Sequence, residues 1–146
     1  VLTETVAILA FIAQSFPDAR LAPLDDPFAF GQVQAFDAYL ASTGHVAHAH
    51  GRRAARWADD PAAQHAMQAK VAANMSECFG LIESQLLQGP WVMGEAYSIC
   101  DPYLFTIAGW LEGDGVDMGR FPKVADHFRR MADRPAVGKV LAEEGL

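Results

Sequence analysis

The sequence predicts an all-α protein, and three observations lead to that class. Apolar residues recur at helical spacing along most of the chain, clear start and stop signals separate the helical stretches, and no stretch alternates apolar and polar residues as a strand would. The chain has 146 residues, 51% of them hydrophobic, which is enough for one domain with a sizeable core.

The stretch from Ile99 to Leu111 is expected to be the buried centre of the bundle, within a helix over residues 98–111. It carries one charge, Asp101, and its apolar side chains fall on every side of a helical wheel. Ser98 is a preferred N-cap residue, and the Asp101 carboxylate three positions later can accept a hydrogen bond from the Ser98 backbone N–H. We therefore interpret Ser98 and Asp101 as a structural capping box.

Two long antiparallel helices are expected to flank this central helix, joined by a turn near residues 57–60. Asp26-Pro27 and Asp60-Pro61 each place an N-cap residue before a proline at the first helical position, and Gly89-Pro90 ends the second helix. The apolar stripes that follow the two caps are Ala29, Val33, Phe36, Leu40, Thr43 and Ala47, and then Met67, Val71, Met75, Cys78, Ile82 and Leu86.

Shorter helices complete the prediction. A first helix runs over residues 3–15 with Thr3 as its cap, and two more run over about 121–133 and 134–143 after a break at Glu112-Gly113-Asp114-Gly115. The inward residues of the helix over 121–133 are expected to be Val124, Phe128 and Met131. The segment over 17–25 reads as a linker, so residues 26–146 form a helical domain of about five helices and residues 1–16 a leading helix outside it.

Composition excludes several classes of partner. Eleven basic and eighteen acidic residues give a net charge of −7, which argues against nucleic acid binding, and the one basic cluster, at residues 52–56, is explained as a solvated helix end. No apolar run is long enough for a membrane span, so we expect no membrane partner. Cys78 and Cys100 read as small buried hydrophobes, which fits a reducing, cytoplasmic setting.

Three histidines, His45, His48 and His50, raise the question of a metal site. His45 and His48 share a helix face, but His50 points elsewhere and no carboxylate sits at a ligand spacing. We therefore expect no bound metal.

Several separated motifs resemble the cytosolic glutathione transferases, in particular the bacterial, beta-like members. The residues that carry the resemblance are Val1–Leu9, Ser42–His50, the Ser98–Asp101 box after Gly94, and Asp133–Val137. The resemblance covers essentially the whole chain. It implies a C-terminal helical domain preceded by the last helix of a thioredoxin-like domain, most of which is absent here. The chain does not begin with Met and enters a helical pattern at once, so we expect it to be the middle of a longer protein.

The resemblance also implies roles for individual residues. Glu4 and Thr5 would hold the γ-glutamyl end of glutathione, His45 would lie near the glutathione sulfur as a catalytic residue, and Tyr103 and Trp110 would line the site of an apolar second substrate. The alternatives are that Thr3 and Glu4 are ordinary first-turn residues, that His45 sits at the edge of the helix pair, and that Tyr103 and Trp110 only fill the core.

The function that follows is transfer of glutathione, the co-substrate, to hydrophobic electrophiles by the intact protein, a detoxifying homodimer. This chain would supply the wall of the electrophile site and part of the glutathione clamp. By itself it is expected to be inactive, because the thiol-activating residue lies upstream. The alternative is a non-enzymatic dimerisation or protein-binding module with the same fold.

Overall fold

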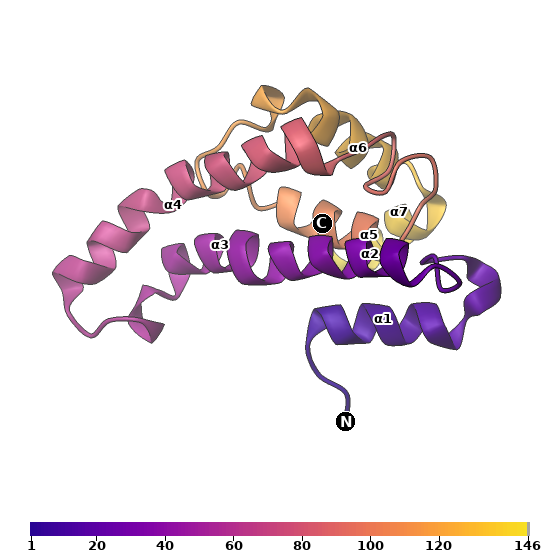
Figure 1. Ribbon diagram of the computed structural model, residues 1–146. Helices are drawn as coiled ribbons and strands as arrows, with labels where there is room; N and C mark the ends of the chain where they lie inside the picture. The colour runs from indigo at the N-terminus through magenta and orange to yellow at the C-terminus, as the bar shows by residue number, and fades with distance from the viewer. Residues whose placement is uncertain (146) are drawn as a thin grey trace.

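The computed structural model describes residues 1–145, and within them it contains seven α-helices and no β-strand. The all-α prediction is confirmed. The helices are α1 (Thr5–Ser15), α2 (Pro27–Tyr39), α3 (His45–Arg52), α4 (Pro61–Leu81), α5 (Cys100–Ala108), α6 (Pro122–Ala132) and α7 (Pro135–Glu144). Figure 1 shows α2 and α3 as one long rod with α1 alongside α2, while α4 forms the other long arm and meets α3 at the far end.

Asp26 and Asp60, which were predicted to start the two long helices, cap α2 and α4 with their side chains. The Asp26 carboxylate accepts hydrogen bonds from the N–H groups of Phe28 and Ala29 at 2.9 and 3.0 Å, and the Asp60 carboxylate accepts one from Ala62 at 3.0 Å. Helix α1 differs from its prediction, because the residue at its N-cap is Glu4 and no side chain caps it. The expectation that Thr3 caps this helix is wrong.

Two wide π-helical turns were not predicted. Leu40–Gly44 joins α2 to α3, and Ile82–Leu86 extends α4. A π turn holds more residues than an α turn and therefore changes which side chains face inward. Gly44 is buried and Thr43 is exposed, so the predicted inward position of Thr43 is wrong.

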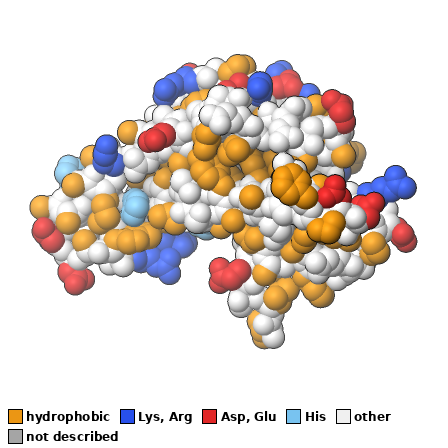
Figure 2. Space-filling model, in the orientation of Figure 1, with side chains coloured by type: hydrophobic (Ala, Val, Ile, Leu, Met, Phe, Trp, Pro, Cys, Tyr) orange, Lys and Arg blue, Asp and Glu red, His pale blue; other side chains and the backbone are white. Residues whose placement is uncertain are grey.

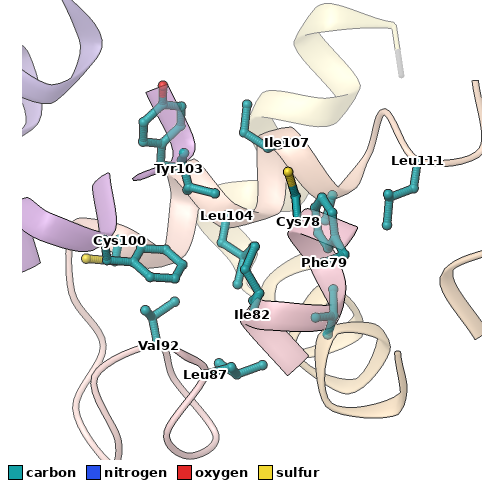
Figure 3. Close-up of a cluster of buried hydrophobic side chains, with 14 of the residues drawn as sticks. Cys78, Phe79, Ile82, Leu87, Val92, Cys100, Tyr103, Leu104, Ile107 and Leu111 are labelled. Carbon is teal, nitrogen blue, oxygen red and sulfur yellow. The ribbon is translucent and has the colours of Figure 1, made fainter. Parts of the chain in front are cut away.

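The core is built around α5, as expected. Leu104 and Ile107 of α5 have no exposed surface, nor have Phe79 and Ile82 of the α4 arm, and Figure 3 shows these side chains meeting in one cluster. Helix α5 is shorter than the predicted 98–111, because turns replace the helix after Ala108 and lead into Gly115, which has a φ of 76°. Cys78 and Cys100 are both buried free thiols, as predicted.

A buried hydrogen-bond network around Asp101 fixes the start of α5. The Asp101 carboxylate accepts hydrogen bonds from Ser98 N–H at 2.6 Å and from Val92 N–H at 2.8 Å, and it lies 3.0 Å from His127 Nε2 of α6. These bonds satisfy donors that would otherwise be costly to bury. The prediction for α6 omitted His127 from the inward residues, because only the approach of Asp101 makes that position favourable for a histidine.

The loop before α5 depends on two glycines. Gly94 has a φ of 105°, and a Cβ on Gly89 would lie 2.8 Å from the Gly94 carbonyl oxygen. This tight fold brings the Val92 N–H to Asp101. In the part of the chain that the structure describes, no helix has the length and hydropathy needed to cross a bilayer.

Candidate functional site

The start of α1 presents an open helix N-terminus. Glu4 and Thr5 are exposed, the Glu4 carbonyl oxygen accepts the first helical hydrogen bond from Ile8 N–H at 3.0 Å, and no side chain caps the preceding N–H groups. Such free N–H groups, together with the helix dipole, favour an anionic group. Glu4 has a φ of 70°, a strained conformation for a residue with a side chain.

Tyr103 lies on α5 within reach of the Glu4 charge. Its side chain is buried, and its pKa is raised, first by burial and then by the negative charges of Asp37 and Glu4. The phenol therefore remains protonated at neutral pH and can donate a hydrogen bond.

His45 is the first residue of α3 and contacts Trp110, which follows α5. The two rings meet edge to face with centroids 5.1 Å apart, and both side chains are half-buried. The pKa of His45 is lowered, first by burial and then by the positive charges of His48 and Arg53. A neutral imidazole has a free nitrogen lone pair and can accept a proton.

Two further residues join this group, and the sequence analysis assigned neither to a site. His48 stacks on Trp110 with ring centroids 4.3 Å apart, and its Nδ1 lies 2.8 and 2.9 Å from the two carboxylate oxygens of Asp114. Asp114 was interpreted only as part of a helix break, and 66 positions separate it from His48. The shared face of His45 and His48 was the one available signal.

The predicted residues thus form two groups. Glu4 and Thr5 lie at the start of α1 near Tyr103, and His45 contacts Trp110. The space-filling view shows a notch between α1 and the arm formed by α3 and α4 (Figure 2). Among the described residues no three His, Cys, Asp or Glu side chains are arranged to hold a metal ion.

Two hollows lie elsewhere on the surface, each of about 680 Å³. One lies between the linker and α2, where Leu24, Gln32 and Tyr97 line it, and the other lies between the α2–α3 rod and α4, where Tyr39 and Asn74 line it. Neither is lined by a residue predicted to be catalytic or to bind substrate, although Ser98 of the capping box lines the first.

Comparison with known proteins identifies the relatives of this chain. Residues 4–135 match the family model described as glutathione S-transferase, C-terminal domain. The chain is 28% identical over 146 residues to glutathione S-transferase GstA of Escherichia coli O157:H7, covering 99% of this chain and 69% of that protein.

Two solved structures have the same fold. A glutathione transferase homolog from sulfitobacter, solved with bound glutathione, is 43% identical with a TM-score of 0.95, and the match covers 99% of this chain and 69% of that one. The bacterial beta class glutathione S-transferase of Sphingomonas chungbukensis is 32% identical with a TM-score of 0.82 and the same coverage.

Proposed function

The chain belongs to the glutathione S-transferase family, and from that premise we propose that it is the helical part of an enzyme that transfers glutathione to apolar electrophiles. The observation that carries the proposal is the open N-terminus of α1, where Glu4 and Thr5 stand exposed beside uncapped N–H groups.

The start of α1 has the chemistry to hold the γ-glutamyl end of glutathione. The Glu4 carboxylate complements an ammonium group, and the Thr5 hydroxyl and the first-turn N–H groups complement an α-carboxylate. The positive φ of Glu4 supports the assignment, because backbone strain concentrates at ligand sites. The sulfitobacter relative was solved with glutathione bound.

His45 and Trp110 complete the proposed site. The neutral His45 imidazole accepts a hydrogen bond near the glutathione sulfur and favours the thiolate, while the residue that activates the thiol lies upstream in the thioredoxin-like domain. The thiol releases its proton to water, and the thiolate then attacks the electrophile, forming a carbon–sulfur bond as the leaving group departs. Trp110 offers a half-buried apolar ring for the second substrate, whereas the Tyr103 side chain is buried, which favours the alternative that it fills the core.

The outer face of α1 supports the proposed thioredoxin-like domain. Phe11 and Phe16 are 57% and 63% exposed, and Ile8 and Ile12 of the same helix are more than a third exposed. An apolar face of this kind normally has a partner. We propose that the rest of the glutathione-binding domain covers it, and that the complete enzyme is a homodimer.

The test compares the glutathione affinity of the intact protein with that of its Glu4→Gln variant. This substitution removes the charge of the side chain and keeps its size. We expect the dissociation constant to rise at least tenfold, since an ammonium group loses its counter-charge. Glu95→Gln is the matched control, because Glu95 is also exposed but lies in the loop before α5. Isothermal titration calorimetry measures both variants.

Unchanged affinity in the Glu4→Gln variant would show that the clamp assignment is wrong. If the intact protein binds no glutathione and conjugates no activated aryl halide, the alternative holds, in which the fold serves as a dimerisation or protein-binding module.

A further inference from the structure

Trp110 lies beyond the end of α5, where the backbone is no longer helical. Helix α5 ends at Ala108, and the turns that follow lead to Gly115, whose φ is 76°. A large side chain on such a turn lacks the regular neighbours three and four positions away that fix side chains along a helix. The Trp110 indole therefore needs contacts from elsewhere in the chain to be held in one orientation.

Two histidines of α3 supply these contacts. His48 stacks on the indole with ring centroids 4.3 Å apart and planes at 25°, and His45 meets the same indole edge to face at 5.1 Å. Stacked and edge-to-face contacts both stabilise pairs of aromatic rings. His48 thus covers one face of Trp110, while the tryptophan as a whole is only half-buried.

Asp114 in turn holds His48. Its two carboxylate oxygens lie 2.8 and 2.9 Å from Nδ1 of His48, and its side chain is only 7% exposed. An ionised carboxylate only accepts hydrogen bonds, so Nδ1 is the donor whether the ring is neutral or protonated. The Asp114 backbone N–H also donates to the Trp110 carbonyl oxygen at 3.0 Å. Three contacts therefore join Trp110, Asp114 and His48 in a closed ring.

We propose that Asp114 and His48 are positioning residues, which hold the Trp110 indole in one orientation as a wall of the site for the apolar second substrate. Asp114 acts on His48, and His48 acts on Trp110, so neither needs to touch the substrate. A binding residue is most precise when its neighbours lock its rotamer, and the closed ring of contacts does so here. The consequence for the substrate rests on the proposed function, whereas the effect on the indole does not.

The competing explanation is purely structural, with the hydrogen bond between His48 and Asp114 only tying α3 to the turn after α5. Both explanations predict a less stable protein when Asp114 loses its carboxylate. Only positioning predicts a selective change at the Trp110 indole and in the binding of the second substrate. These two quantities therefore separate the explanations.

The first test is ¹⁹F NMR of the intact protein labelled with fluorotryptophan, in wild type and in the Asp114→Ala variant. Loss of the carboxylate frees His48, so we expect the Trp110 resonance to shift or broaden while the other tryptophan resonances stay in place. A Trp110→Phe variant assigns the resonance. Asp114→Asn should restore the wild-type resonance, because the asparagine side-chain oxygen still accepts from Nδ1 of His48.

Asp117→Ala is the matched control, three residues further along the chain. The Asp117 carboxylate also accepts a hydrogen bond, but from the Gly119 N–H at 2.8 Å and not from His48. We expect the Trp110 resonance to stay in place in this variant. An unchanged Trp110 resonance in Asp114→Ala, or an equal change in Asp117→Ala, would overturn the inference.

The kinetics of the intact enzyme test the consequence for the substrate. In Asp114→Ala we expect the KM for an activated aryl halide to rise at least about threefold while kcat and the glutathione dissociation constant change less than about twofold, the pattern of lost uniform binding. Asp114→Asn should recover most of the wild-type KM. A fall in kcat and in glutathione affinity with no rise in KM would show a structural role and overturn the inference.

Should Asp114→Ala fail to fold, His48→Gln takes its place, because glutamine can donate an N–H to Asp114 but has no ring to stack on Trp110. We expect the same change of the Trp110 resonance and the same rise in KM, and the absence of both would overturn the inference.

The two measurements also separate this inference from the proposed function. If the Trp110 resonance changes and the KM does not, the contacts position the indole, and the placing of Trp110 in the second-substrate site is wrong. If the intact protein conjugates no aryl halide, the proposed function is wrong, and the resonance alone decides whether Asp114 positions Trp110.

Discussion

Asp37 lies on α2 with no exposed surface, and neither of its carboxylate oxygens accepts a hydrogen bond of good geometry. Burial raises the pKa of Asp37 to about 6, the nearby Cys100 thiol offsets part of this rise, and the charge of Asp101 adds to it. The equally buried Asp101 carboxylate differs, because it accepts hydrogen bonds from two backbone N–H groups and the Ser98 hydroxyl and lies 3.0 Å from His127 Nε2. Asp37 therefore costs stability whenever it is ionised.

The pH dependence of stability follows from this raised pKa. Between the ordinary value of 3.8 and about 6 the folded chain binds more protons than the unfolded chain. The contribution of Asp37 to the free energy of unfolding therefore falls as the pH rises through that window, and it stays low at higher pH. Asp37→Asn removes the ionisation, and we expect it to be more stable than wild type at pH 7 by at most about 3 kcal/mol and about equal at pH 4.

Urea unfolding at pH 4, 5, 6 and 7 measures the difference between the two proteins. Asp18→Asn, at an exposed position, is the control and should show no such trend. A difference for Asp37→Asn that is the same at every pH would contradict the account.

At the residue scale the sequence predicts local chemistry well and long-range pairing poorly. The capping pattern of Ser98 and Asp101 was visible because the two residues are three positions apart, and the hydrogen bond joins them. The partners His127 and Asp114 were not visible, because they meet Asp101 and His48 only after the chain has folded. The spacing placed His48 on the same helix face as His45, but it gave no sign of the contact between His48 and Asp114.

At the element scale the order of the helices and two of their starts could be predicted, but not their number. Six helices were expected and the described residues form seven, because the π turn Leu40–Gly44 divides the first long helix into α2 and α3. Proline after aspartate marks the starts of α2 and α4 because both effects are local. The π turns depend on packing across the bundle. A Cβ on Gly44 would lie in ordinary van der Waals contact, 3.6 Å from Ile107 of α5, and a stripe of apolar residues carries no information about which residues of another helix it will meet.

The loop between α4 and α5 offers a prediction at this scale. Alanine at Gly94 would have to adopt a φ of 105°, and we expect Gly94→Ala to lower the free energy of unfolding by about 1–3 kcal/mol. No heavy atom lies within 4 Å of a Cβ at Gly94, so the cost arises in the backbone alone.

Gly31→Ala is the matched control for the Gly94→Ala variant. Gly31 lies on the exposed side of α2, and a Cβ there also meets no atom within 4 Å. Alanine favours a helix, so this variant should be more stable by roughly 0.5–1 kcal/mol. Denaturant unfolding compares the two variants, and equal effects would contradict the role assigned to the φ of Gly94.

At the scale of the whole molecule, the sequence predicts the fold class and the family, and the matched relatives confirm both. The proposed site is harder to predict, because its residues come from α1, α3, α5 and the turn after α5. The chain spans 69% of the length of its sulfitobacter relative, and the apolar face of α1 is open.

The most direct test of the central claim is the structure of the intact protein with reduced glutathione bound. We expect the γ-glutamyl carboxylate at the Thr5 hydroxyl and the first-turn N–H groups of α1, the ammonium at the Glu4 carboxylate, and the sulfur on the side of His45. Glutathione bound in the hollow between the linker and α2, with Glu4 and Thr5 left free, would contradict the claim.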